Sequence, residues 1–343
     1  MENINLEYVL NLTKELIDIP SVVGFTDEVT ERVKQELDKY GIKYTYTKKG
    51  ALVAEIEGKN NDKAKMISVH VDTIGAIVKK IKPNGRLELV NMGGIIWAGV
   101  EAENVTIHSF HGKKYQGSVL PIKASAHTYG DDAREIIRRT DTVEVRIDEE
   151  VAEYQDTYNL GIRVGDCVSF EARTVITDSG YIKSRYLDDK LCIAQVFGYI
   201  KYMKESKKIP DNKLYIYFSN YEEIGHGISV IPEDVHEVIS LDIGIVSNDS
   251  MSDEKKVSIA MKDFKTIYDV GINRKLVELA EKHGIGYAMD IYNRYGSDSS
   301  AAVLQMADVT IACIGPGIDA SHHYERTHIQ GVIETIKLMI VYF

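Results

Sequence analysis

Two adjacent glutamates, Glu222 and Glu223, follow a run of apolar and aromatic residues in the segment LYIYFSNYEEIGHG, residues 214–227. The run is rich in Tyr, Ile and Phe and indicates a buried strand, so both carboxylates would lie just past its carboxyl end. Neighbouring residues that leave a strand point in different directions. One carboxylate could therefore bind a metal ion while the other accepts a proton. A lone pair of glutamates also suits a solvated turn, so this interpretation depends on further residues.

Histidine and carboxylate side chains also stand at the ends of other apolar strands. His70 and Asp72 stand near the end of the segment MISVHVD, and Asp242 stands near the end of VISLDIG. In open α/β sheets, binding sites form at the carboxyl ends of the strands. Further candidates stand at the start of a predicted helix and after a Gly-Pro-Gly loop, namely Asp188, Asp189, His322 and His323. Each has a structural explanation when taken alone; Asp188 or Asp189, for example, could be a helix N-cap.

Taken together, these residue types indicate metal chemistry. Histidine and carboxylate ligands without cysteine suit zinc and similar metals. Two co-catalytic ions about 3.5–4 Å apart need several protein ligands, one of them bridging. The candidates can supply two histidines and three carboxylates, with one carboxylate to spare. Adjacent glutamates argue against a glycosidase, whose two carboxylates face each other across a sugar, about 5–9.5 Å apart.

The elements that must position these residues alternate between strands and helices. Apolar spacing predicts helices at 5–18 and 27–40, and the alternation returns late in the chain, which favours a mostly parallel sheet covered on both faces. The segment 74–173 is instead rich in strands and contains a hairpin with a Pro-Asn-Gly turn. We therefore predict a three-layer α/β/α catalytic domain, residues 1–73 and 174–343, interrupted by an inserted β-rich domain.

Composition excludes several classes of function. The 343 residues carry a formal net charge of -11, which gives no support to nucleic-acid binding or to attachment to an anionic membrane. No apolar run approaches the length of a membrane span, and the first residues do not form a secretory signal pattern. The three cysteines are scattered and indicate buried thiols in a reducing cytoplasm: Cys167, Cys192 and Cys313. We expect a cytoplasmic protein.

The motifs as a set resemble the TET-type (tetrahedral) aminopeptidases, co-catalytic metallopeptidases related to glutamyl aminopeptidase and to relatives that carry the name endoglucanase. The resemblance covers nearly the whole chain, and its specificity comes from the order and wide spacing of the motifs. They are HVDTIG at 70–75, SRYLDDK at 184–190, NYEEIGHG at 220–227, SLDIG at 240–244, GSDSSAA at 296–302 and ASHHYERTH at 320–328.

The resemblance implies a dinuclear metal site in which each ion has its own pair of ligands. His70 and Asp242 would hold one metal ion, Glu223 and His322 would hold the other, and Asp188 would bridge the two. The implied cofactors are two divalent ions per chain, with zinc expected and cobalt or manganese as alternatives.

The same resemblance assigns the remaining roles. Glu222 would be the general base that acts on a metal-activated water, and Asp72 would orient and polarise His70 without binding metal. A cis peptide bond between Asp188 and Asp189 is also implied, which favours Asp188 as the bridge.

This chain departs from the usual family pattern at four places: Thr73 stands where Glu is common and Lys190 where Arg is common, and the other two departures bear on the substrate. Ser299 and Ser300 stand where Ala-Gly is common, and a His-Tyr pair follows the last ligand histidine where Ser-Pro is usual. Because His322 and His323 are adjacent, His323 remains an alternative ligand to His322. Both departures leave the preferred N-terminal residue of the substrate open.

The resemblance further implies that the inserted domain is PDZ-like and promotes dimerisation, with dimers assembling into a tetrahedral dodecamer. We expect an aminopeptidase that trims N-terminal residues from short peptides. Two alternatives remain: a metal-dependent deacylase or amidase acting on a small blocked dipeptide or amino-acid derivative, and a non-catalytic metal-binding scaffold. Retention of Glu222 together with the ligand set argues against the scaffold.

Overall fold

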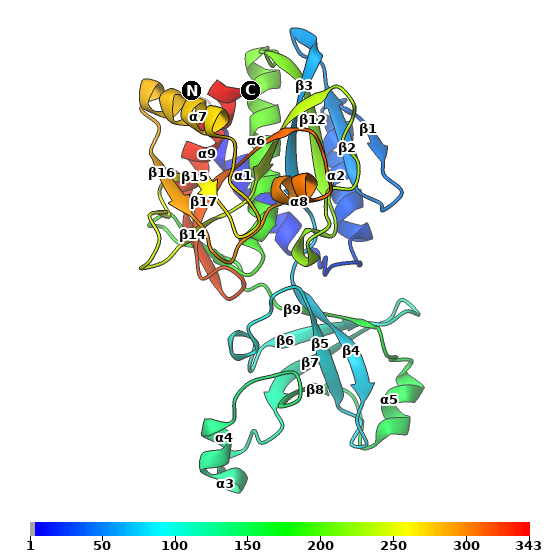
Figure 1. Ribbon diagram of the computed structural model, residues 1–343. Helices are drawn as coiled ribbons and strands as arrows, with labels where there is room; N and C mark the ends of the chain where they lie inside the picture. The colour runs from blue at the N-terminus through cyan, green and yellow to red at the C-terminus, as the bar shows by residue number, and fades with distance from the viewer. Residues whose placement is uncertain (1–3) are drawn as a thin grey trace. The chain divides into compact units, whose positions relative to one another are not determined.

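The computed structural model describes residues 4–343, and the chain divides into two compact units (Figure 1). One unit contains the residues up to Asp72 together with Arg173–Phe343, and the other contains Thr73–Ala172. These boundaries fall one residue away from those expected from the change in strand pattern.

The larger unit is built on a 12-stranded mixed sheet. Its strands are β1 (Lys43–Tyr46), β2 (Leu52–Ile56), β3 (Asn60–His70), β10 (Val175–Ile176), β11 (Tyr181–Ser184), β12 (Asn212–Ser219), β13 (Val235–Leu241), β14 (Gly244–Val246), β15 (Val257–Lys262), β16 (Tyr287–Ile291), β17 (Thr310–Asp319) and β18 (Glu325–His328). The main path runs β1-β2-β12-β3-β13-β17-β18-β11-β10; β14 and β15 pair with β17, and β16 pairs with β15.

The centre of this sheet is parallel, which brings the carboxyl ends of several strands to one edge. β3 pairs in parallel with both β12 and β13, and β13 pairs in parallel with β17. The register places Ser219, the last residue of β12, opposite His70, the last residue of β3. The expected strand ends therefore lie side by side.

Helices cover the sheet in the predicted three-layer α/β/α arrangement. They are α1 (Leu6–Ile17), α2 (Asp27–Lys39), α6 (Leu187–Ser206), α7 (Val270–His283), α8 (Asp298–Leu304) and α9 (Ile329–Tyr342). Helix α1 buries Val9, Leu12 and Leu16 at helical spacing, and Asn5 caps it by accepting a hydrogen bond from the backbone N–H of Tyr8 at 2.9 Å. Helix α6 is buried on nearly all sides, because it contacts α1, α9 and the sheet.

The smaller unit is a closed antiparallel barrel in the order β4-β5-β8-β7-β6-β9. Its strands are β4 (Gly75–Ile81), β5 (Leu87–Met92), β6 (Asn104–His108), β7 (Lys114–Pro121), β8 (Val143–Ile147) and β9 (Cys167–Phe170). Alternate residues such as Val105, Ile107 and Val145 fill its interior. Closure removes exposed sheet edges, and the buried cluster inside the barrel gives this unit a hydrophobic core of its own.

The barrel unit also contains three short helices that the strand-rich pattern did not predict: α3 (Ala126–Tyr129), α4 (Asp131–Glu135) and α5 (Tyr154–Leu160). Helices of four to seven residues are too short to show a helical period in the sequence. The predicted hairpin is present as β4 and β5, and Gly85 occupies its turn with φ of +75°.

Two further observations concern the helices and the cysteines. No helix within residues 4–343 is long and apolar enough to cross a membrane. The three cysteines are free and buried.

Candidate metal centre

The parallel centre of the sheet delivers predicted site residues from three neighbouring strands. His70 ends β3, and Glu222 and Glu223 lie in a single 3-10 turn that begins three residues after β12. Asp242 directly follows β13. Because β12, β3 and β13 are adjacent and parallel, these side chains meet at one edge of the sheet.

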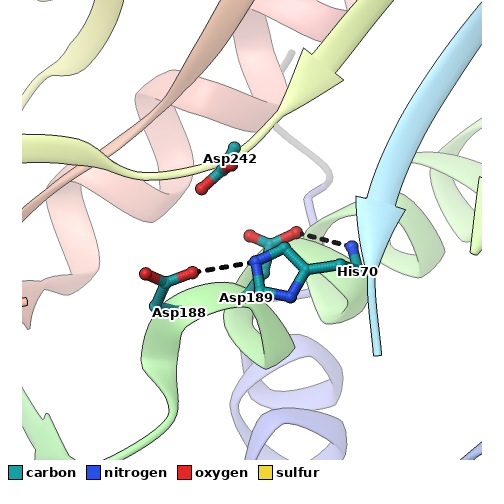
Figure 2. Close-up of side chains that lie close together, drawn as sticks. All are labelled: His70, Asp188, Asp189 and Asp242. Atoms are coloured by element: carbon teal, nitrogen blue, oxygen red, sulfur yellow. Dashed lines mark hydrogen bonds and ion pairs between the residues drawn. The ribbon is translucent and has the colours of Figure 1, made fainter. Parts of the chain in front are cut away.

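A first group of possible ligands consists of His70, Asp188, Asp189 and Asp242. All four are buried, and each offers one ligand atom within 4.8 Å of the others. Figure 2 shows that they come from three elements: Asp188 and Asp189 from the start of α6, His70 from the end of β3, and Asp242 from the segment after β13. Nε2 of His70 lies 3.0 Å from Oδ1 of Asp188.

A second group consists of Asp188, Glu223 and His322, whose ligand atoms also lie within 4.8 Å of one another. Nε2 of His322 lies 3.3 Å from Oε2 of Glu223 and 3.6 Å from Oδ2 of Asp188. Asp188 therefore belongs to both groups, with Oδ1 toward His70 and Oδ2 toward His322. That is the arrangement a bridging carboxylate requires. Within residues 4–343, the groups contain His322 and do not contain His323.

Asp189 is a site residue whose place sequence reasoning did not foresee. The peptide bond between Asp188 and Asp189 is cis, as the resemblance implies. The Asp189 carboxylate joins the first group, and its Oδ2 accepts a hydrogen bond from the backbone N–H of His70 at 3.0 Å. Its signal in the sequence is the one that it shares with Asp188, a carboxylate at the start of a predicted helix, and the resemblance gives it no role.

Asp72 contacts His70 through its backbone. The Asp72 carbonyl oxygen lies 2.8 Å from Nδ1 of His70, whereas the nearer carboxylate oxygen is 3.8 Å from the same nitrogen. The carboxylate accepts hydrogen bonds from the backbone N–H groups of Glu222 at 3.2 Å and Glu223 at 3.1 Å. Asp72 thus holds the turn that carries both glutamates, and its carbonyl orients the imidazole.

Glu222 lies beside the candidate ligands without joining either group. Its Oε2 is 3.8 Å from Nε2 of His70, and its side chain is 12 % exposed. The side chain of Glu223 is only 4 % exposed. The two neighbours therefore differ in position: the Glu223 carboxylate belongs to a ligand group, and the Glu222 carboxylate lies outside both groups.

Close packing places Asp242 on the sheet edge. Gly315 of β17 lies against it, and a Cβ at this glycine would be 1.6 Å from the carbonyl oxygen of Asp242. The backbone N–H of Asp242 donates to the carbonyl oxygen of Ile314 at 2.9 Å. A residue with a side chain at 315 would force the backbone of Asp242 to shift, so glycine permits this close approach.

The electrostatics of the site show a surplus of buried negative charge. Burial raises the pKa of Glu223 to about 8 and that of Asp242 to about 7, and the charge of Asp188 contributes to both increases. Burial also raises the pKa of Glu222 well above its usual value. Burial alone would lower the pKa of His322, but the charges of Glu223 and Asp188 outweigh it and raise that pKa to about 10.

The donor set and its charge fit divalent cations. Imidazole and carboxylate ligands converge in two groups that share Asp188, and cations placed among these carboxylates would offset their mutual repulsion. The fold and the site together define an α/β protein with a candidate metal centre at the carboxyl edge of its sheet.

Comparison with known proteins gives the family. A family model described as M42 glutamyl aminopeptidase matches residues 50–338, and the chain belongs to this family. The Bacillus subtilis protein YhfE, a putative aminopeptidase by name, is 41% identical over 335 residues, which cover 97% of this chain and 96% of YhfE. The chain is a peptide hydrolase of the aminopeptidase type, so the predicted family and class of enzyme are confirmed.

Solved structures share the fold at low sequence identity. Aminopeptidase APDkam598 from Desulfurococcus kamchatkensis has a TM-score of 0.88 and 19% identity, covering 98% of this chain and 94% of that one. The TET1 peptidase of Pyrococcus horikoshii has a TM-score of 0.82 and 20% identity, covering 97% and 98%. The latter can assemble into a tetrahedron or a large octahedral shell. The predicted fold class is confirmed.

Proposed function

We propose that this protein is a dinuclear metal-dependent aminopeptidase that removes N-terminal residues from short peptides in the cytoplasm. The observation that carries the proposal is the sharing of Asp188 between two ligand groups. His70 and Asp242 would complete one metal site, and Glu223 and His322 the other. When bound, two divalent ions, with zinc expected and cobalt or manganese as alternatives, would lower the pKa of a water molecule and polarise the scissile carbonyl.

Glu222 would be the general base. Its carboxylate lies outside both ligand groups and 3.8 Å from Nε2 of His70, close enough to act on a water between the ligands. It would accept a proton as the water oxygen bonds to the carbonyl carbon. It would then donate that proton to the amine nitrogen as the C–N bond breaks. Asp72 would keep the carboxylate in reach, since it holds the backbone of Glu222 and Glu223.

We propose a homo-oligomer for the assembled enzyme, with dimers building a tetrahedral dodecamer and the barrel unit as the dimerisation element. The support is the assembly named for TET1, a solved structure of the same fold, together with the self-contained barrel that adds no residue to either ligand group.

The test is a substrate panel on metal-stripped enzyme reloaded with zinc, cobalt or manganese. The expected result is no hydrolysis after exhaustive chelation. Metal should restore hydrolysis of substrates with a free N-terminal amine, with about two ions bound per chain. Full activity after chelation would contradict the dinuclear mechanism. Activity confined to N-acylated substrates would show a deacylase or amidase, and metal binding with no hydrolysis of either kind would show a scaffold.

A further inference from the structure

Glu325, the first residue of β18, is a buried glutamate for which the proposed mechanism has no use. The residue is 2 % exposed, and its carboxylate receives backbone N–H groups from two separate segments. Oε2 accepts from Leu187 at 2.7 Å and from Asp188 at 3.3 Å, while Oε1 accepts from His322 at 3.2 Å. One carboxylate thus links the backbone of Asp188 to that of His322.

The strand register explains why Glu325 reaches both segments. β18 pairs antiparallel with β11 and places Glu325 opposite Ser184, only a few residues before Asp188. On its other side, β18 pairs with β17 through Arg326 and Asp319, and the loop between these two strands carries His322. The carboxylate therefore lies where the two ligand-bearing segments leave the sheet.

Both segments contain unfavourable backbone conformations that contacts with other parts of the chain must stabilise. His322 has φ of +65° and Tyr186 has φ of +68°, the left-handed region that L-residues other than glycine seldom adopt. Asp188 has non-helical angles inside the first turn of α6. Such conformations persist when surrounding contacts hold them, and the Glu325 carboxylate contacts both segments.

We infer that Glu325 is a positioning residue that sets the separation of Asp188 and His322 and thereby tunes binding of the second metal ion. This inference rests on the proposed function, because it assumes that Asp188 and His322 bind metal. Glu325 would act through backbone N–H groups, whereas its side chain binds no ion. Partners that orient ligands in this way typically contribute about 10–100-fold to metal affinity.

Glu325→Gln is the substitution that tests this inference most directly. An amide keeps the shape of the side chain but has one oxygen, so its NH₂ group must face an N–H of either the Leu187–Asp188 segment or His322. One of the two contacts is therefore lost. Glu334→Gln is the matched control, since Glu334 is also a buried glutamate, 4 % exposed, and accepts a backbone N–H from Gly286 at 2.9 Å.

The experiment titrates zinc into the metal-free full-length wild type and both variants, with ion content by mass spectrometry and folding by circular dichroism. In the wild type we expect two binding steps. In Glu325→Gln we expect one step weakened about 10–100-fold and the other retained, with Glu334→Gln unchanged. Two wild-type steps in Glu325→Gln would overturn the inference, and so would equal weakening of both steps.

A double-mutant cycle covers the case in which Glu325→Gln folds poorly. Because Glu325 would act through His322, Glu325→Asp and His322→Ala should weaken the same metal-binding step. The double variant should then lose less binding free energy at that step than the two single losses added together. Additive losses would overturn the inference. Fewer than two ions in the wild type would instead contradict the dinuclear function itself, so the two failures are distinguishable.

Discussion

Neutralising Glu222 and Glu223 one at a time tests the division of roles between two adjacent side chains. Glu222→Gln should abolish most turnover and leave the metals bound. The Glu222 carboxylate lies outside both ligand groups, and its backbone is held by Asp72, whose contacts an amide side chain does not disturb. Glutamine cannot accept the proton, so we expect a loss of about 10²–10⁴-fold in kcat, or roughly 2.7–5.4 kcal/mol in activation free energy.

Glu223→Gln should act on metal binding first. The Glu223 carboxylate lies in the second ligand group, 3.3 Å from Nε2 of His322, and its side chain is almost fully buried. A neutral amide is a poorer partner for a divalent ion than a carboxylate, so this variant should retain fewer than two ions per chain. Its activity should recover in part when the metal concentration is raised.

The assay pairs kcat on a free-amine peptide with metal content by mass spectrometry for both variants and the wild type. Glu334→Gln provides the control for loss of a buried glutamate away from the ligand groups. The reasoning fails if Glu222→Gln keeps most of its activity. It also fails if Glu222→Gln loses its metals while Glu223→Gln retains them.

Two further perturbations address the support of the site and the assembly. Asp298→Asn should lower kcat. Its buried carboxylate accepts hydrogen bonds from the hydroxyls of Ser68 at 2.7 Å and Ser219 at 2.5 Å, and Ser219 lies just before the turn that carries Glu222, the proposed general base. The matched variant is Asp290→Asn, in a buried carboxylate that accepts four hydrogen bonds at another place in the fold. Each variant should lower the free energy of unfolding by about 1–3 kcal/mol, but Asp290→Asn should leave kcat unchanged. Equal kcat in the two variants would refute the supporting role given to Asp298. Deleting residues 74–173 should give smaller assemblies by light scattering with the larger unit still folded, whereas an oligomer of unchanged size would count against the barrel as the dimerisation element.

The sequence alone predicted the fold class and the list of candidate ligands. Apolar strands that end in His70 and Asp242 are local patterns, and parallel strands must present their carboxyl ends at a common edge. The helix near the amino terminus was predicted at 5–18 and found at Leu6–Ile17, because three-residue and four-residue apolar spacing is a local property. The family followed from the order of motifs and was confirmed by comparison.

Only the tertiary structure shows which candidate residues lie together and which atoms of each contact the others. Only folding shows that Asp188 presents one oxygen to His70 and the other to His322, and that Asp189 joins the first group. It likewise shows that the backbone carbonyl of Asp72 orients the imidazole.

Glu325 is the clearest case of a residue that sequence patterns do not reveal. Its partners, the backbone N–H groups of Leu187 and Asp188, lie more than a hundred residues away, and backbone groups carry no side-chain signature. Local composition predicts which strands form and where they end. Hydrogen bonds to main-chain atoms depend on register and strand order across the whole sheet, and those arise only when distant segments pack together.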